Sequence, residues 1–375
     1  MEDGDSSDPA VLSPEELYWK DQYEWLLAAG YRLRSRYSPD WKPSWSGTSN
    51  SPMRYEDSRK NWASTINYAI QLKTNRFITI KKVDKVKYPR EVEVTEYLSS
   101  EPLRDDPSNH AVRPIEVLSH PTDEKTAFLV LPLLRNYDDP EFKTVGEIVG
   151  FIGQFLVGMK FLHEHKVSHG DVSINNIMMD ASDLYPKGFH PIEHDMAPDY
   201  RGPVSAKYTR TEKPPQYYLI DFGLSRRLDT NDDEPYRPGT DVSLPEYEDL
   251  TKPIDAYLVD VYCVGNMIKY EFLDGDPERG TRTGFKNFEF LRPLVDDMTH
   301  DDPDSRPKMV EVVKRFQEIV KSLSTATLRA RCLRNPLYEG EEDPPGIITF
   351  ALSVGHWYKR ILYVAKRLPP VPGGM

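Results

Sequence analysis

The sequence has few cysteines and no excess of basic residues. Its two cysteines, Cys263 and Cys332, are too few for a disulfide framework or for a zinc site of their own, which favours a reducing compartment inside the cell. The 60 acidic residues outnumber the 48 basic ones and give a net charge of −12. A surface this acidic repels nucleic acids and anionic bilayers. We therefore expect neither a nucleic acid nor a membrane among the partners.

The later part of the chain has no long apolar run. The most apolar late stretch, residues 346–352, is far shorter than a bilayer span requires. The N-terminus has no basic flank and no apolar run, so no signal peptide is expected. These features predict an intracellular protein in the cytoplasm, with the nucleus as an open alternative.

Composition divides the chain into five segments, and 38% hydrophobic residues suffice for a sizeable core. Residues 1–13 are acidic and Ser-rich and are predicted to be disordered. Residues 14–52 are predicted to form a helix, which starts after an N-cap at Ser13, and then a linker rich in Pro and Trp. Residues 53–135 are strand-rich and residues 136–323 mainly helical, followed by an extension over residues 324–375.

The local patterns predict an α+β protein, with a small strand-rich lobe followed by a larger helical one. Strands are expected where β-branched and aromatic residues gather, at residues 67–73, 76–83, 128–134, 177–179 and 217–220. Helices are expected where apolar residues recur at helical spacing, at residues 89–99, 148–163 and several times between 258 and 323. A last, basic helix is expected over residues 357–368, with its aromatic side packed on the large lobe or, alternatively, touching an acidic partner.

The strongest chemical signal is the run His-Gly-Asp-Val-Ser-Ile-Asn-Asn at residues 169–176, followed by Asp-Phe-Gly at residues 221–223. Phosphoryl transfer needs a carboxylate to orient the attacking hydroxyl and oxygen ligands to hold magnesium against the phosphates. Asp171 can act as the base, and Asn176 on the same loop can bind the metal. Asp221 can supply the other metal ligand. An isolated Asp-Phe-Gly is an ordinary turn, but the two motifs in this order are rare.

With these motifs the chain resembles the eukaryotic-type protein kinases, whose signature is His-Arg-Asp, four residues, Asn, and later Asp-Phe-Gly. The resemblance implies a bilobal protein-kinase-like fold, with a small β-rich N-lobe and a larger, mainly α-helical C-lobe. It also implies an ATP- and Mg-dependent enzyme that transfers the γ-phosphoryl group to a protein hydroxyl. Ser or Thr is the expected acceptor, and Tyr stays open because Ser173 stands where the serine/threonine kinases have a lysine. The substrate protein and the oligomeric state stay unknown.

The same resemblance implies roles for residues outside the two motifs. Lys81 ends a strand and would grip the α- and β-phosphates, and Glu91 would pair with this lysine. The hinge that meets adenine would be the segment that contains Leu131, Leu133 and Leu134.

Three later motifs are similar to the family's framework. They are Leu244-Pro245-Glu246, the run that starts at Asp260, and the run that ends at Arg306-Pro307. Arg306 would pair with Glu246 and support the helical lobe.

More narrowly, the chain resembles a group of kinase-domain proteins from mushroom-forming (basidiomycete) fungi. This resemblance rests on three runs: Tyr18-Trp19-Lys20-Asp21 to Ser44-Trp45, Tyr185-Pro186-Lys187-Gly188-Phe189-His190-Pro191, and Leu323-Ser324-Thr325.

Three departures from the kinase pattern favour an alternative. No glycine occurs between Gly47 and Gly146, so the Gly-rich loop over the phosphates is absent. Gly170 replaces the family's arginine, and Ser173 replaces the lysine that neutralises the transferring phosphate. The alternative is a pseudokinase that acts as a binding or scaffold module. A lesser alternative, a small-molecule phosphotransferase, rests on the His-Gly-Asp run at residues 169–171, which resembles aminoglycoside- and choline-type kinases.

Overall fold

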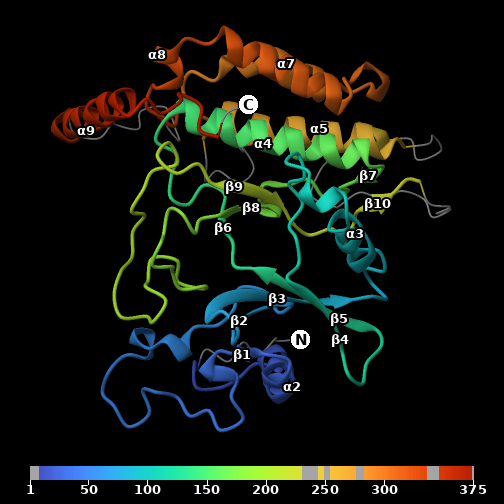
Figure 1. Cartoon of the computed structure of the whole chain (residues 1–375), viewed down its shortest axis with the longest axis vertical. Helices are drawn as coiled ribbons and strands as arrows, with labels where there is room; N and C mark the ends of the chain where they lie inside the picture. Colours follow the sequence, from blue (N-terminus) through green and yellow to red (C-terminus); the bar gives the residue numbers. More distant parts are fainter. Residues whose placement is uncertain (1–7, 230–243, 249–253, 276–282, 336–345, 374–375) are drawn as a thin grey trace. The chain divides into compact units, whose positions relative to one another are not determined.

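A computed structural model describes the chain over residues 8–229, 244–248, 254–275, 283–335 and 346–373 (Figure 1). The protein is α+β, with antiparallel sheets and helices, as predicted. Its chain divides into two units. Unit 1 consists of residues 1–92, 113–135 and 185–207, and unit 2 of residues 93–112, 136–184 and 208–375.

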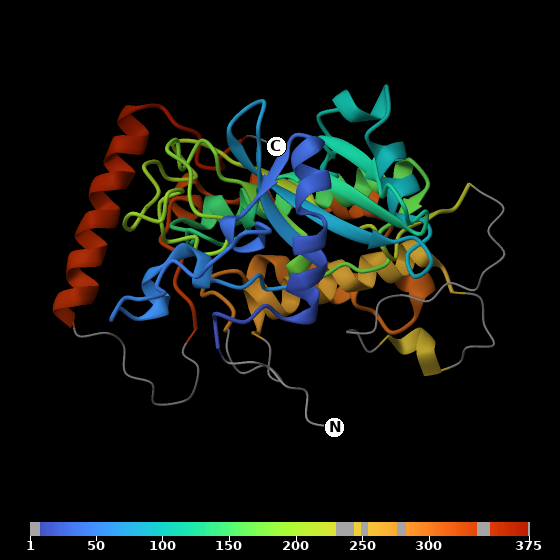
Figure 2. The same cartoon turned by 90° about the horizontal axis from the view of Figure 1, so that it is seen from below.

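Unit 1 is built on a five-stranded antiparallel sheet with the strand order β1-β2-β3-β5-β4. Its strands are β1 (Tyr31–Leu33), β2 (Ile66–Gln71), β3 (Arg76–Asp84), β4 (Glu116–Ser119) and β5 (Thr126–Pro132). Helices α1 (Pro14–Asp21) and α2 (Tyr23–Ala28) lie across one face of this sheet (Figure 2). The core is formed by buried residues of both layers: Trp19, Leu26, Tyr31, Leu33, Tyr37, Ala69, Ile78, Ile80, Phe128 and Val130.

The longer strands of this sheet were predictable, whereas the shortest ones were not. β2, β3 and β5 confirm the strands expected at residues 67–73, 76–83 and 128–134. β1 and β4 are only three and four residues long, too short for an alternating pattern to stand out. β1 pairs with β2, with Arg32 opposite Ile70, so the boundary predicted after residue 52 falls inside unit 1.

The start of α1 is the predicted one. The Ser13 hydroxyl accepts a hydrogen bond from the Glu16 amide, and the Glu16 carboxylate accepts one from the Ser13 amide, which completes a capping box. Residues 1–7 of the predicted disordered tail lie outside the described residues. The carbonyls of Pro9 and Val11 accept hydrogen bonds from the buried Arg36 guanidinium, so the predicted disorder does not extend to these two residues.

Unit 2 is mainly helical. Its helices are α4 (Val145–Glu164), α5 (Ala256–Ile268), α6 (Arg292–Met298), α7 (Met309–Ser322), α8 (Thr325–Leu328) and α9 (Gly346–Ala365), and a π-helical turn, Lys269–Leu273, follows α5. α7 packs along α4 (Figure 1), and α6 packs on α5. α4 is long and apolar enough to cross a membrane, but 83% of that window is buried inside the protein, as in the core helix of a folded unit.

Short strands and α3 complete the secondary structure. β8 (Ile177–Asp180) and β9 (Gln216–Leu219) are the expected strands, and they form a small sheet with β6 (Arg135–Asn136). β7 (Val167–Ser168) pairs with β10 (Arg226–Arg227), and α3 (Glu91–Leu98) confirms the helix expected over residues 89–99. The short 3₁₀ helices are Ser35–Tyr37, Pro52–Arg54, Glu56–Ser58, Leu103–Asp105, Ile174–Asn176, Pro245–Glu248, Glu289–Leu291 and Pro303–Ser305.

The last helix begins earlier than predicted and packs with a different face. Tyr363 is buried and donates a hydrogen bond to Thr209, and Lys366 pairs with Glu212. Trp357 and Tyr358, however, are 63% and 60% exposed. The expectation that the aromatic side of this helix packs on the rest of the chain is therefore right for Tyr363 alone, because the other two rings lie on the opposite face.

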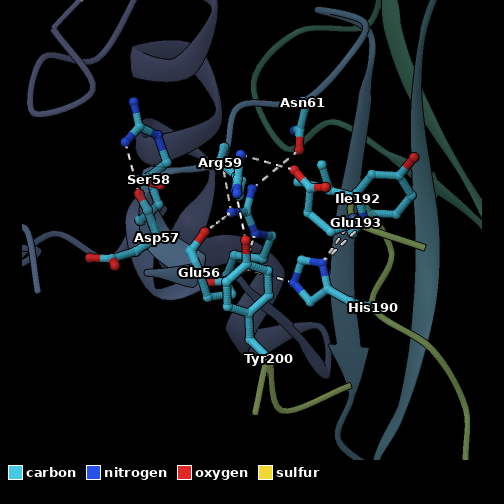
Figure 3. Close-up of polar contacts among 12 residues, drawn as sticks. Glu56, Asp57, Ser58, Arg59, Asn61, His190, Ile192, Glu193 and Tyr200 are labelled. Carbon is cyan, nitrogen blue, oxygen red and sulfur yellow. Dashed lines mark hydrogen bonds and ion pairs between the residues drawn. The ribbon is translucent and has the colours of Figure 1, made fainter. Parts of the chain in front are cut away.

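Residues 185–207 are attached to the long β1–β2 connection within unit 1 (Figure 3). The Arg59 guanidinium donates a hydrogen bond of 2.7 Å to the Tyr200 hydroxyl and lies 3.2 Å from the Glu193 carboxylate. These contacts join segments that are more than a hundred residues apart in the sequence, which no local pattern predicts.

Glu56 is the acidic centre of this network (Figure 3). Its Oε1 accepts hydrogen bonds from Arg34 Nε at 2.5 Å and from His190 Nε2 at 3.2 Å. Burial by itself would raise the pKa of Glu56, but the hydrogen bonds and the positive charge of these partners outweigh it and lower the pKa to about 2. The ionised carboxylate thus stabilises the folded state.

The lowered pKa of Glu56 predicts how stability responds to acid. Its contribution is complete above the unfolded pKa near 4.5 and is lost as the pH falls toward 2. Between pH 6 and pH 3 the wild type should therefore lose roughly 2 kcal/mol more free energy of unfolding than Glu56→Gln. Urea unfolding at both pH values measures this difference. Glu24→Gln, at an exposed position in α2, should behave as the wild type does, and equal losses for all three proteins would contradict the assignment.

Candidate functional site

The loop that carries Asp171 is held by a single buried carboxylate. Asp260, on α5, accepts hydrogen bonds from the amides of His169 at 2.8 Å and Gly170 at 3.0 Å, and another from His163 Nε2 at 3.0 Å. The His169 carbonyl accepts a bond of 2.7 Å from the Ser225 hydroxyl. The backbone just before Asp171 is therefore fixed.

Asp171 and Asn176 are in direct contact. The Asn176 Nδ2 donates hydrogen bonds to the Asp171 carbonyl at 2.8 Å and to its Oδ2 at 2.9 Å. Asp171 is only half-buried, so its carboxylate can be reached by another group. With Nδ2 bonded to Asp171, the Asn176 Oδ1 is left to accept or to ligate.

Asp221 lies at the same end of the β8–β9 pair as Asn176. Ile177 is opposite Leu219, and the Ile220 amide donates a bond of 2.9 Å to the Asn176 carbonyl. Residue 176 directly precedes β8, and residue 221 comes two positions after the end of β9. Asp221 has a positive φ of 63° and accepts a bond from the Gly223 amide at 3.2 Å. The strand register thus brings Asp171, Asn176 and Asp221 together in unit 2.

These three residues offer hard oxygen donors. An amide oxygen and a carboxylate are the kind of ligand that Mg²⁺ takes, usually with water and phosphate oxygens in the remaining positions. Among the described residues no group of three or more His, Cys, Asp or Glu side chains can hold a metal by itself. The donor set from Asn176 and Asp221 therefore fits a magnesium ion shared with a phosphate ligand.

His169 is fully buried beside this site and is structural. Burial lowers its pKa, although the nearby carboxylates of Asp260, Asp171 and Asp221 oppose this effect. Its Nδ1 accepts a hydrogen bond from the Asp171 amide at 3.3 Å. His169 thus holds the loop through its bond to the Asp171 amide.

The conformation of Gly170 explains why no larger residue stands there. Its φ is +77°, and a Cβ at this position would lie 2.5 Å from the Leu224 carbonyl oxygen. Both the left-handed backbone and the close approach exclude a side chain. The missing arginine at this position is thus a consequence of the backbone path.

The other predicted site residues belong to unit 1. Lys81 on β3 and Glu91 at the start of α3 form the predicted ion pair, with a separation of 2.5 Å. The side chains are 14% and 2% exposed, so the pair is largely removed from solvent. A lysine held this way has a defined position next to a carboxylate.

The predicted hinge residues lie at the end of β5 and directly after it. Leu131 pairs with Thr79 of β3, and Leu133 and Leu134 come directly after β5. Leu134 is buried, while Leu131 and Leu133 are half-buried. The segment is thus partly accessible, which is what an adenine contact requires.

The connection between β1 and β2 is long and is held by hydrogen bonds. It runs from residue 34 to residue 65 between β1 and β2 and contains one glycine, Gly47. Asp57 within it accepts hydrogen bonds from the Trp41 indole and the Ser44 amide, each at 2.9 Å. A flexible, glycine-lined phosphate cradle is therefore not the structure found here.

Arg306 and Glu246 form the predicted ion pair in unit 2, at 2.5 Å, with side chains 0% and 8% exposed. Arg306 also donates to the carbonyls of His300 and Leu258, so the buried guanidinium has several acceptors. The pair therefore has a structural role in unit 2.

The sequence did not predict which residues hold the loop that carries Asp171. The motif that starts at Asp260 was recognised, but its bonds to residues 169 and 170 join positions about 90 residues apart. The same holds for Ser225 and His163. No spacing rule connects these residues, so only the folded chain identifies them.

The Gly170 backbone can be tested against a matched glycine. Gly47 has nearly the same φ, +78°, but nothing lies within 4 Å of its would-be Cβ. Gly47→Ala should cost about 1 kcal/mol from the backbone alone. Gly170→Ala should cost about 2 to 4 kcal/mol because overpacking against Leu224 adds to the same strain. Denaturant unfolding measures both, and equal losses would mean that the loop has room for a side chain.

Comparison with known proteins adds no family to this geometry. No protein-family model matches the chain, and no curated protein matches it. Functional interpretation therefore depends on the residues themselves.

Proposed function

We propose that this chain is a protein kinase that uses ATP and Mg²⁺ and transfers the γ-phosphoryl group to a hydroxyl of a protein, of Ser or Thr. The observation that carries the proposal is the grouping of Asp171, Asn176 and Asp221 at one end of the β8–β9 pair. The buried Lys81–Glu91 pair supports it independently. The strand-rich unit 1 and the helical unit 2 are compatible with the bilobal kinase-like fold that we propose for the chain.

The proposed step assigns one role to each residue. Asp171 accepts the proton of the substrate hydroxyl, whose oxygen forms a bond to the γ-phosphorus while the bond from that phosphorus to the β–γ bridging oxygen breaks and ADP leaves. Asn176 and Asp221 hold the metal, which neutralises charge on the phosphates. Lys81, held by Glu91, binds the α- and β-phosphates. The segment with Leu131, Leu133 and Leu134 contacts the adenine.

A narrower origin and a cellular location are part of the proposal. We propose, on the resemblance of the three sequence runs, that the chain is related to the kinase-domain proteins of mushroom-forming fungi. Trp19, Tyr185, Phe189 and His190 of these runs are buried in unit 1. Both cysteines are free thiols. This supports an intracellular location, in the cytoplasm or the nucleus.

A second candidate function is a pseudokinase that binds a partner without phosphoryl transfer. The tightly bonded residue 34–65 connection favours it, because such a segment offers no run of glycine amides to the phosphates. Ser173 in place of a lysine favours it as well, since no cation at that position neutralises the moving phosphate.

Three variants distinguish the two functions. Asp171→Asn should lower the phosphotransfer rate about 10²- to 10⁴-fold but leave nucleotide binding intact, because only the base is lost. Lys81→Met should mainly weaken ATP binding, and Asp221→Ala should remove the part of the thermal shift that depends on Mg²⁺. Radiolabel transfer to a mixture of protein acceptors and thermal shift with ATP, with and without Mg²⁺, are the measurements.

The outcomes separate the candidates clearly. A wild type that transfers no more phosphate than Asp171→Asn, yet is stabilised by nucleotide, is a binding module. A wild type that phosphorylates free amino sugars or choline but no protein is a small-molecule phosphotransferase.

A further inference from the structure

Helix α3 needs support from its surroundings. It has only eight residues, Glu91–Leu98, and helices this short are marginal in isolation. Glu91 begins the helix, and its pairing with Lys81 depends on where the helix lies. Glu93 and Tyr97, four residues apart, lie on one face of the same helix.

Arg227 on β10 contacts this face in two ways, by an ion pair with Glu93 and by stacking of its guanidinium on the Tyr97 ring. The guanidinium lies 4.0 Å from the centre of the Tyr97 ring, and its Nη1 lies 3.2 Å from Glu93 Oε1. Its Nη2 lies 3.0 Å from the Asp229 carboxylate. Arginine is suited to this arrangement because a planar guanidinium can stack on an aromatic ring and still donate at its edges.

The backbone at Arg227 and Leu228 is held by hydrogen bonds. Residue 227 pairs with Val167 of β7, and the Leu228 amide donates a hydrogen bond of 2.7 Å to the Lys166 carbonyl. Tyr97 is also attached to this region, because its hydroxyl donates to the His165 carbonyl at 3.3 Å. Arg227 and Tyr97 thus connect α3 to the β7–β10 pair, within a few residues of the loop that carries Asp171.

Two of the partners of Arg227 are carboxylates of the chain itself, at Glu93 and Asp229. An arginine that is already paired with carboxylates in this way needs no phosphate to hold it in place. Gly170, just before Asp171, has no side chain with which to bind one. Both features are properties of the unmodified chain.

We propose that Arg227 is a positioning residue, which holds α3 and through it Glu91, so that Lys81 stays paired without phosphorylation of the chain. The proposal rests on the proposed function, for which it names the mode of regulation: a constitutively positioned α3. In this proposal Arg227 acts through the helix and not on nucleotide or substrate.

The first test does not depend on phosphotransfer. In Arg227→Ala without nucleotide, amide exchange of residues 93–98 should accelerate about tenfold or more, because the helix loses its main polar attachment. Acylation of Lys81 by an amine-reactive probe, followed by mass spectrometry, should rise about threefold or more as the Lys81–Glu91 pair opens. Arg227→Lys should fall between wild type and Ala, because it keeps the charge but not the stacking plane.

A matched control variant and a double-mutant cycle distinguish the loss of this contact from a general loss of stability. Arg315 is likewise a half-exposed arginine that pairs with a carboxylate of the chain, here that of Asp297, and Arg315→Ala should change neither readout. The effects of Arg227→Ala and Tyr97→Leu should not add in the double variant, because each breaks the same contact. Unchanged exchange and unchanged Lys81 labelling in Arg227→Ala would overturn the proposal.

The second test concerns activity. Arg227→Ala should raise the KM for ATP about tenfold with a smaller change in kcat, since Lys81 is misplaced while Asp171 is not. Phosphatase treatment of the wild type should leave its rate unchanged. A rate that falls with phosphatase would overturn the proposal, whereas a wild type without any phosphotransfer would refute the proposed function and leave the exchange and labelling results to decide on Arg227.

Discussion

The buried carboxylate of Asp260, with the three hydrogen bonds that it accepts, is the constraint on which the candidate site depends. A buried carboxylate is costly unless donors surround it, and here two backbone amides and one imidazole satisfy it. The same bonds fix the backbone at residues 169 and 170, where the positive φ of Gly170 turns the chain toward Asp171. The backbone just before Asp171 is therefore held by a residue about 90 positions away in the sequence, in the first half of α5.

Unit 1 uses buried guanidinium groups for a comparable purpose. Arg36 is fully buried and bonded to Glu16 and to the Asp57 carbonyl, and Arg34 is bonded to Glu56 and to the Arg59 carbonyl. A charge buried in this way demands that its acceptors stay in place. The connection from residue 34 to residue 65 consequently has a fixed path. In a nucleotide-binding protein such a connection cannot fold over phosphates as a glycine loop does, so phosphate binding would depend on Lys81 and on the metal.

Whether a feature could be predicted from the sequence depends on how many consecutive residues encode it. Elements of six or more residues with a clear period, such as β2, β3, α3 and α4, were predicted from their own residues. The three-residue β1 was missed because no period can be read from so short a segment. The pairs Lys81–Glu91 and Arg306–Glu246 were expected from motif resemblance, and both exist. Contacts without a motif, such as Arg227 on Tyr97, were not predictable, since they depend on how β10 and α3 meet.

The balance of charge in the helical unit bears on the choice between an enzyme and a binding module. His169 is within electrostatic reach of three carboxylates, at Asp171, Asp221 and Asp260, and burial still lowers its pKa. A neutral imidazole does not compensate them. Like charges that gather around one point raise the free energy of the folded state unless a cation joins them. Asp260 accepts its bonds from amides and an imidazole, Asp171 accepts one from Asn176, and Asp221 accepts one from the Gly223 amide. A divalent cation with a phosphate ligand would give Asp171, Asn176 and Asp221 a shared function, and this is the ground on which we propose an enzyme.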